Sequence, residues 1–249
     1  MRSRLRGAAG IALFLFVWQA LVALHVPYFT RVPSPLDVMR AFGSAVHDPS
    51  YYADWAASAR RVFVGFVIAL GAGVPLGLAI GTQRRFRDLV FPVFELFRPI
   101  PPLAWIPLSI LFWPTTESSI EFVIVLGGVY VIALNTIAGV EHADRRYVDA
   151  ARSLGATPLT IFRRIVLPAA LPAIAVGATV AMGLTWSVLV AAEIIAGHDG
   201  LGRRTWEAYV AGAFPAIVVG MISMGLAGWA SSALVRWCAA RLTPWVRAA

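Results

Sequence analysis

The sequence has no lysine at all, so its 21 basic residues are all arginines. A phosphate-binding loop of the Gly-Lys-Ser/Thr type needs a lysine, so the chain is not expected to hydrolyse ATP or to bind a cofactor of its own. Cys238 is the single cysteine, which excludes an internal disulfide and a cysteine-rich metal site. The four histidines are scattered, and no grouping of Ser, His, Asp or Cys predicts an enzyme. His198 and Asp199 are too few for a metal site.

Charge is also scarce, because only 14% of the residues are charged while 59% are hydrophobic. The mean hydropathy of +0.75 places the chain among membrane proteins. The net charge of +8 lies in short loops between apolar segments. There it indicates membrane orientation rather than nucleic-acid binding.

Long apolar runs are what the sequence does contain. A bilayer core of ~30 Å needs roughly 20 apolar helical residues. Six segments qualify: 9–26, 57–81, 89–113, 120–140, 168–196 and 211–237. The first could be a signal peptide, but its apolar run is long and no clear cleavage site follows, which favours a retained span. We therefore predict an all-α membrane protein with about six transmembrane helices in the lipid bilayer.

The arginines predict the orientation. With the N-terminus in the cytoplasm, 14 arginines fall on the cytoplasmic side and 6 outside. This split predicts that both termini are cytoplasmic. Arg60 and Arg61, at the start of the second span, oppose it; either they extend to the outer interface or the boundary is misplaced.

The chain divides into three parts in this interpretation. Residues 1–56 hold the first span and an outer segment, 57–237 form the transmembrane core, and 238–249 form a cytoplasmic tail. Within the first part, apolar residues from Leu36 to Val46 recur at roughly helical spacing. The segment is either an amphipathic helix on the outer interface or an ordinary connector.

A charged segment, DAARSLGATPLTIFRRIVLP, separates the fourth and fifth spans. A short helix is predicted from Arg145 to Leu154, and Gly155 permits the positive φ that ends it. Thr157 is a predicted N-cap, with Pro158 at the first helical position of a second short helix. Pro168 is predicted to start the next span. The result is a helix–turn–helix elbow on the cytoplasmic face.

This segment resembles the cytoplasmic motif of permease subunits of bacterial ABC importers, Glu-Ala-Ala, three residues, Gly, nine residues, Ile-x-Leu-Pro. The departure is Asp149 in place of Glu. Other stretches resemble the branch for nitrate, taurine and alkanesulfonate uptake: VPSPLDV, RVFVGF, RPIPPLAWIPLSILF, LNTIAGV and VAAEIIAGHDGLG. The residues that the resemblance assigns to ATPase coupling are Asp149, Ala150, Ala151, Arg152, Gly155, Thr157, Arg163, Arg164, Ile165, Leu167 and Pro168.

The resemblance implies partners. Two copies of a cytoplasmic ABC ATPase hydrolyse ATP, a second permease copy completes a homodimer, and a periplasmic binding protein delivers the solute. The best guess for the solute is a small anion such as a sulfonate, taurine or nitrate. The alternatives are a thiamine-precursor pyrimidine or a riboflavin-like solute, and, in another class, a stand-alone secondary transporter.

The third span is rich in proline, and broken helix is tolerated in lipid only where protein or a cavity surrounds it. We therefore expect this span at the seam between two permeases. Glu95 and Arg98 can pair on one helix face, either as a structural ion pair or as a pathway element. The candidates for the pathway or gate are Glu95, Arg98, Pro99, Pro102, Trp105, Trp186 and Glu193. Glu193 either serves a gate or the binding protein, or accepts hydrogen bonds from the loop at 200–202.

Overall fold

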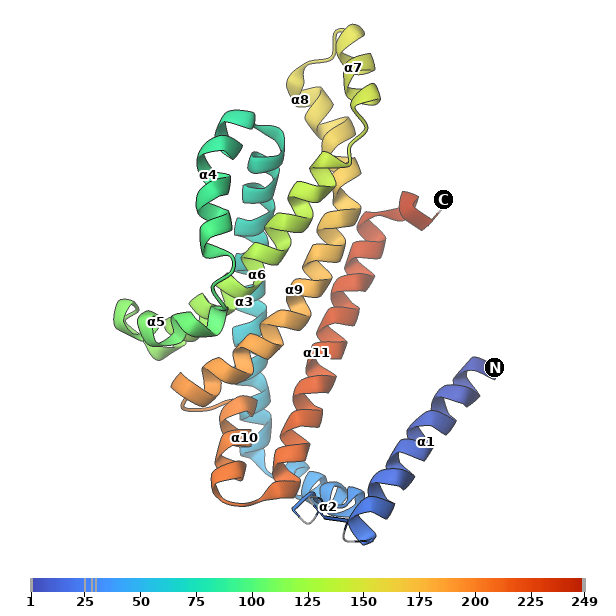
Figure 1. Ribbon diagram of the computed structural model, residues 1–249, viewed down its shortest axis with the longest axis vertical. Helices are drawn as coiled ribbons and strands as arrows, with labels where there is room; N and C mark the ends of the chain where they lie inside the picture. Colours follow the sequence, from blue (N-terminus) through green and yellow to red (C-terminus); the bar gives the residue numbers. More distant parts are fainter. Residues whose placement is uncertain (1, 25, 28, 30, 248–249) are drawn as a thin grey trace.

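The computed structural model describes residues 2–24, 26–27, 29 and 31–247, and every regular element in those ranges is helical. The long helices run along the long axis of the molecule (Figure 1). The elbow lies at one end, here termed the elbow end, and α10 lies near the opposite end, the α10 end. The all-helical fold class predicted from the sequence is confirmed.

The helices follow one another without strands in the described part of the chain. They are α1 (Arg2–Ala23), α2 (Pro35–Val46), α3 (Pro49–Thr82), α4 (Arg84–Phe97), η1 (Pro102–Trp105), α5 (Ile106–Phe112), α6 (Thr116–Glu141), α7 (Arg145–Ser153), α8 (Pro158–Ile161), η2 (Phe162–Val166), α9 (Leu167–Ala196), α10 (Leu201–Val210), α11 (Phe214–Leu242) and η3 (Pro244–Arg247).

The core is built on α6, which lies between α3 and α9. Small residues permit this close packing, because helices without a hydrophobic driving force approach through van der Waals contact. A Cβ added at Gly77 of α3 would lie 2.6 Å from the Thr136 Cβ of α6. One added at Gly177 of α9 would lie 2.6 Å from the Asn135 Cβ. The fifth span is therefore rich in glycine and alanine because it packs against its neighbour backbone to backbone.

Four helices of the described part are long and apolar enough to cross a membrane. They are α3, α6, the continuous helix from Pro158 to Ala196, and α11. A fifth span results if α4 and the η1–α5 unit, bent by 86°, count together. The predicted first span contains only a shorter apolar helix, Ala9–Ala23, so six spans are not confirmed.

The second predicted span begins earlier than the sequence pattern indicated. Asp48 caps α3 by accepting a hydrogen bond from the Ser50 amide at 2.9 Å, and Pro49 occupies the first helical position. Arg60 and Arg61 therefore lie inside the helix. The helix therefore begins eight residues before the predicted start of the apolar span, at about residue 57, because backbone chemistry rather than polarity sets a helix end.

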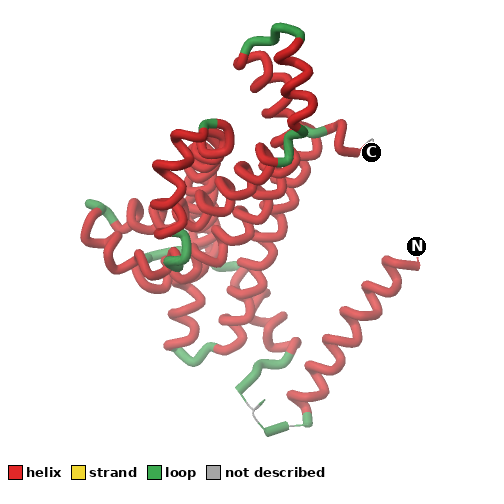
Figure 2. The backbone as a smooth tube through the Cα atoms, turned by 45° about the horizontal axis from the view of Figure 1, so that its top comes forward, coloured by secondary structure: helices red, strands yellow, loops and turns green. Residues whose placement is uncertain are grey.

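The N-terminal helices differ in how they contact the bundle. Ser34 and Asp37 form a capping box at the start of α2, where Val38 is buried and Leu36 and Met39 are exposed. The predicted amphipathic helix is thereby confirmed as a helix with two faces. By contrast, α1 stands apart from the other helices (Figure 2). It contacts α2 and donates a hydrogen bond from the Trp18 indole to the Pro33 carbonyl.

Candidate functional site

The elbow projects beyond the other helices at its end of the molecule (Figure 1). Asp144 caps α7 through the Arg146 amide at 2.9 Å, and Gly155 adopts a φ of 79° after the helix ends. Thr157 then caps α8, accepting from the Thr160 amide, with Pro158 at the first helical position. The predicted helix, glycine turn and second helix are all present.

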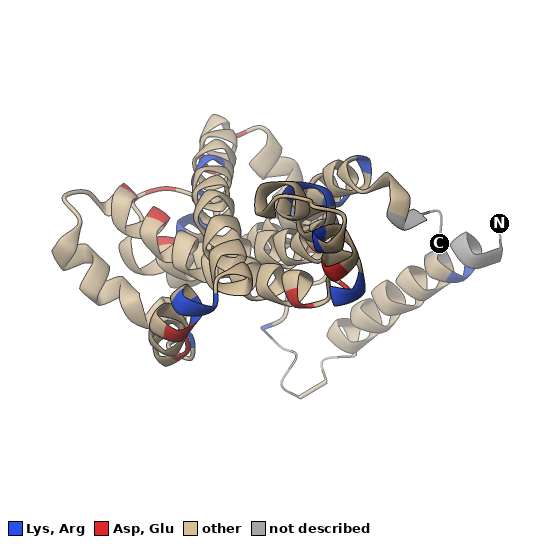
Figure 3. Ribbon diagram, turned by 90° about the horizontal axis from the view of Figure 1, so that it is seen from above, with Lys and Arg blue, Asp and Glu red and all other residues tan. Residues whose placement is uncertain are grey.

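The elbow presents a charged and partly apolar surface. Acidic and basic positions gather on it when it is viewed from above (Figure 3). Leu154 is 87% exposed, and Tyr147 and Leu159 are exposed as well. Asp149 and Arg152 form an exposed pair at 3.8 Å, which contributes little stability in water. Exposed apolar side chains beside such charges are typical of a surface that another protein covers.

The elbow passes into α9 without interruption, which corrects the prediction of a new span at Pro168. The helix from Pro158 to Ala196 is continuous, and residues Phe162–Val166 form a π-helical turn just before the proline. Pro168 lacks the amide hydrogen that an α-helix requires, and a widened turn before it accommodates the missing bond. The second helix of the elbow and α9 are therefore one continuous helix.

The third span is bent, as its prolines predicted. α4 ends at Phe97, and the chain turns by 86° through Pro99–Pro102 into η1 and α5. The Arg98 guanidinium donates to the Glu95 carboxylate at 2.8 Å, and both side chains are about half exposed. Pro99 is exposed and Trp105 is half-buried. The predicted ion pair is present, and it faces away from the core of this chain.

At the α10 end, a buried arginine joins four parts of the chain. The Arg61 guanidinium of α3 donates to the Glu193 carboxylate of α9 at 2.8 Å and to Glu117 of α6 at 3.0 Å. It also donates to the Asp199 carbonyl at 3.0 Å and forms an ion pair with the Asp199 carboxylate. The side chain of Arg61 is 2% exposed and that of Glu193 is 0% exposed. We call Arg61, Glu117, Glu193 and Asp199 the arginine cluster.

Glu193 has a second set of partners that hold the loop before α10. Its carboxylate accepts hydrogen bonds from the Ser58 hydroxyl at 2.8 Å and from the Gly202 amide at 2.8 Å. A negative charge at the start of a helix is stabilised by the helix dipole and the free amides. Of the two interpretations of Glu193, the loop contact is confirmed. Direct contact with a binding protein does not fit a fully buried side chain.

A neighbouring cluster fastens α10 to the start of α3. The Arg204 guanidinium donates to Asp48 at 2.6 Å and to Asp54 at 3.1 Å, and it lies over the Tyr51 ring. Hydrogen bonds from Arg204 and Ser50 lower the pKa of Asp48 to about 2. Burial lowers the pKa of Arg204, but the hydrogen bonds and charges of Asp48 and Asp54 outweigh this effect and raise the pKa overall. The ion pair of Arg204 with Asp48 therefore stays charged over the whole physiological pH range.

Sequence reasoning missed both clusters. The sequence feature that could have revealed them is an ionisable residue in or next to an apolar run, such as Arg61, Glu117 or Glu193. Such residues are energetically unfavourable in a membrane unless they are paired. The partners of Arg61 are 56 and 132 residues away in the chain. No local pattern indicates which carboxylate meets which arginine.

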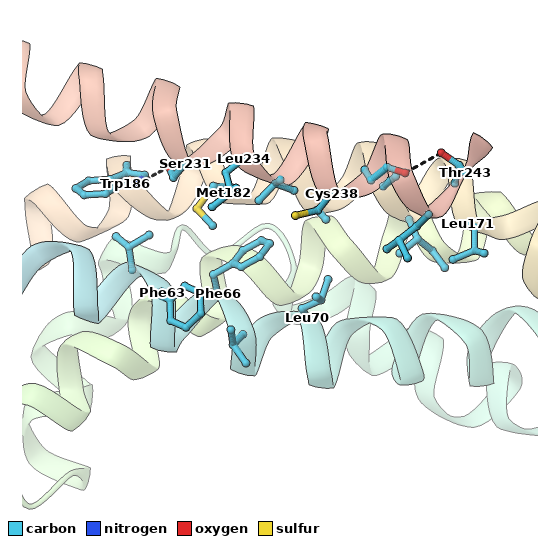
Figure 4. A pocket seen from close by; sticks show the side chains of 18 of the residues that line it. Phe63, Phe66, Leu70, Leu171, Met182, Trp186, Ser231, Leu234, Cys238 and Thr243 are labelled. Carbon is cyan, nitrogen blue, oxygen red and sulfur yellow. Dashed lines mark hydrogen bonds between the residues drawn. The ribbon is translucent and has the colours of Figure 1, made fainter. Parts of the chain in front are cut away.

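Trp186 lies inside the bundle rather than at an open pathway surface. It is buried, and its indole donates to the Ser231 hydroxyl of α11 at 2.9 Å. It lines an apolar cavity of about 460 Å³ between α3, α9 and α11 (Figure 4). Phe63, Phe66, Leu171 and Cys238 line the same cavity (Figure 4). Among the described residues, no group of His, Cys, Asp and Glu could hold a metal ion.

Comparison with known proteins identifies the class. Residues 73–248 match the family of binding-protein-dependent transport system inner membrane components. The chain belongs to this family. It is a multi-pass permease subunit of an ABC importer, a transport component rather than an enzyme, and its membership implies an ATPase and a binding protein as partners.

Three relatives illustrate the family. A Brucella melitensis protein described as "Probable ABC transporter permease protein" is 37% identical over 231 residues, covering 91% of this chain and 92% of the relative. The nitrate import permease protein of Leptolyngbya laminosa is 32% identical, covering 91% and 83%. The bicarbonate transport system permease protein of Synechococcus elongatus is also 32% identical, covering 87% and 81%.

A solved structure shows the same fold. An inward-facing conformation of the MetNI methionine ABC transporter gives a TM-score of 0.59 at 20% identity. The match covers 74% of this chain and 94% of the other.

Proposed function

We propose that the chain forms, with a second identical copy, the pathway for a small oxyanion across the inner membrane. The proposal rests on the exposed elbow, whose second helix, α8, continues without a break into α9. The relatives' names include nitrate and bicarbonate import, which supports a small oxyanion and favours it over a pyrimidine or riboflavin-like solute. Sulfonates and taurine share this chemistry and stay within the proposal.

The elbow is the proposed contact with the ATPase. Its exposed apolar residues, Tyr147, Leu154 and Leu159, would insert into the partner, and its arginines would steer the encounter. Two ATPase copies would bind and hydrolyse ATP. Because the elbow continues into α9, each movement of the ATPase would be passed to the arginine cluster at the far end of that helix. Transport of this kind requires two arrangements of the helical bundle, and binding of the ATPase would favour one of them over the other.

The bent third span is the proposed wall of the pathway. Glu95 and Arg98 lie next to the bend, and charged groups facing lipid would be strongly unfavourable there. α4 and α5 also expose Leu89, Leu96, Leu111 and Phe112. An unpaired apolar surface beside an ion pair fits a seam between two permease copies. The binding protein would deliver solute at the α10 end, with both termini on the cytoplasmic side.

The first test is capture of the tagged chain in mild detergent, followed by mass spectrometry of the proteins that come with it. Gly155→Pro cannot adopt the required positive φ and should rebuild the elbow turn while leaving the spans intact. ATPase recovery should fall roughly tenfold, as expected when anchor contacts are lost. Uptake should fall with it.

The matched control is Gly212→Pro, which places the same substitution at a positive-φ turn at the α10 end. This variant should still recover the ATPase. Equal ATPase recovery with Gly155→Pro and the unmodified chain would overturn the coupling role of the elbow. A chain that moves solute in vesicles without any ATPase would overturn the proposed importer.

A further inference from the structure

The apolar cavity beside Trp186 is a groove with a buried floor and exposed walls. α9 forms the floor, where Ile174 and Met182 are buried. α3 and α11 form the walls, where Phe63 and Leu234 are exposed. Both walls pack on α9, and Figure 4 shows α3 and α11 on opposite sides of the space. The groove therefore opens between α3 and α11 toward the surroundings of the bundle.

The chemistry of the lining selects an apolar ligand. The described lining residues include two with hydroxyl groups, and both hydroxyls have partners. Ser231 donates to the Gly228 carbonyl at 3.1 Å and accepts from the Trp186 indole, and Thr243 donates to the Ala239 carbonyl at 2.9 Å. The remaining lining is apolar, so the groove favours contact with hydrocarbon over contact with a solute that needs hydrogen bonds.

The dimensions of the groove decide between a helix and a lipid tail. The groove follows α11 from Ser231 to Thr243, roughly 18 Å along the helix axis. This length is close to the depth of one leaflet, about 15 Å, which is half of the hydrocarbon core. A helix about 10 Å wide would fill roughly 1,400 Å³ over the same length. The groove holds about 460 Å³, so it is too small to enclose a helix but can hold a thin acyl chain.

The elbow end of the groove has the side chains of a membrane interface. Trp237 and Trp245 are exposed there, and tryptophan is enriched at the level of lipid headgroups. Arg241, in the last turn of α11, is exposed and lies over the Trp237 ring at 4.9 Å. It forms no ion pair in the described part of the chain, and the next residue, Leu242, lines the groove. An arginine in this position complements an anionic headgroup.

We propose that the groove binds one acyl chain of an anionic phospholipid from the leaflet at the elbow end, with the headgroup phosphate beside Arg241. The bound chain contacts α3, α9 and α11 together and holds both walls on the helix that continues into the elbow. The proposal depends on the chain lying in a membrane and not on the identity of the transported solute.

The first test measures lipid retention. The full chain, with the proteins that co-purify with it, is placed in nanodiscs of equal phosphatidylglycerol and phosphatidylcholine and then transferred to mild detergent. Native mass spectrometry counts the lipids that stay bound. Ala175→Phe fills the groove and should reduce retained lipid by about tenfold, as expected when several methylene groups lose their contacts. Val176→Phe puts the same side chain on the next residue, which is exposed outside the groove, and should retain lipid normally.

A second pair of variants tests the headgroup contact without changing the groove. Arg241→Gln should lower the preference for phosphatidylglycerol over phosphatidylcholine by about threefold, the size of an exposed charge contact. Arg236→Gln removes the same charge from an exposed position of α11 that does not line the groove, and the preference should be unchanged. This pair decides the proposal if Ala175→Phe does not fold.

A cross-link tests the competing occupant, which is α1 of this chain or of a second copy. Phe14 is exposed on α1, and Cys238 is the natural cysteine in the groove. Mild oxidation of Phe14→Cys in native membranes should leave Cys238 unpaired. A disulfide with Cys238 would assign the groove to α1 and overturn the lipid proposal. Equal lipid retention in Ala175→Phe and Val176→Phe, or equal headgroup preference in Arg241→Gln and Arg236→Gln, would overturn it as well.

Discussion

At the residue scale, Arg61 is a buried side chain whose guanidinium contacts three carboxylates. It lies in a membrane-spanning helix, yet it is 2% exposed and contacts carboxylates from α6, α9 and the loop before α10. A buried ion pair of this kind stabilises little over an apolar replacement of both partners. Removing Glu193 alone is different: Arg61 keeps its partly exposed partners Glu117 and Asp199, but it loses the carboxylate that is fully buried beside it.

We therefore predict that Glu193→Ala lowers the free energy of unfolding by about 2–3 kcal/mol, because Arg61 loses its fully buried partner and the amide of Gly202 loses its acceptor. Thermal unfolding in detergent, followed by tryptophan fluorescence, measures this. The control is Glu207→Ala, which breaks the exposed pair with Arg203 and should change stability by less than about 1 kcal/mol. Similar losses of stability in both variants would show that the buried cluster stabilises the protein no more than an exposed ion pair does.

Gly200 gives a second prediction at this scale. Its φ is 107°, and a Cβ there would lie 2.3 Å from the Glu193 carboxylate. Gly200→Ala should therefore displace the loop and destabilise the protein by several kcal/mol, on the order of a strained backbone plus a broken buried contact. Gly212→Ala, at φ 69° with open space around it, should cost only about 1 kcal/mol. The same unfolding assay ranks the two variants, and the reverse order would contradict the contact.

At the scale of elements, α9 connects the two ends of the molecule. Its elbow end passes through the π-helical turn into α8, and its other end carries Glu193. α10 is fastened to the start of α3 through Arg204, Asp48 and Asp54. The second helix of the elbow is therefore continuous with α9, and α9 contacts the start of α10 through Glu193. By contrast, the chain is not helical between the end of α6 at Glu141 and the start of the elbow at Arg145.

The pH dependence of the α10 attachment follows from Asp48. Its pKa falls from 3.8 to about 2 on folding, so its stabilising effect is present above the unfolded value and is lost as the pH falls through about 2. Amide protection in α10, corrected for intrinsic exchange, should be unchanged between neutral pH and about pH 4. Asp48→Asn should reduce that protection at both values. If Asp48→Asn leaves α10 protected, the ion pair does not hold the helix.

At the scale of the whole molecule, the single chain leaves large apolar surfaces uncovered. α1 stands apart from the bundle, and the bent third span exposes Leu111 to 81% and Phe112 to 74%. Lipid can cover apolar side chains, but the exposed ion pair of Glu95 and Arg98 lies on the same bent span. A second copy would cover both features at once.

The seam can be tested by cross-linking. In a Cys238→Ala background, Leu111→Cys should give a covalent dimer in native membranes on mild oxidation, because the bent span is expected to meet its symmetry mate. The control is Leu154→Cys, which is equally exposed but lies on the elbow, where an ATPase is expected instead. Dimers from Leu154→Cys alone would place the seam elsewhere.

Local chemistry made parts of the site predictable. The elbow depends on Gly155, Thr157 and Pro158, whose backbone preferences act within a few residues, so its turn and cap were predicted at the right positions. The break in the third span coincides with three prolines in four residues, Pro99, Pro101 and Pro102, whereas the single prolines Pro75, Pro92 and Pro172 lie inside helices. The continuity through Pro168 could not be predicted, because a π-helical turn depends on how the flanking helices are held.

The sequence by itself determined the class of the protein, its helical fold, the elbow and the bend, since apolar length, glycine and proline act locally. Only the tertiary structure decided which charges meet. Arg61 contacts Glu117 and Glu193 across 56 and 132 residues, and Trp186 of α9 bonds Ser231 of α11 across 45 residues because these two helices pack side by side. The physical reason is that pairing in a membrane is set by the distance between helices and not by position along the chain.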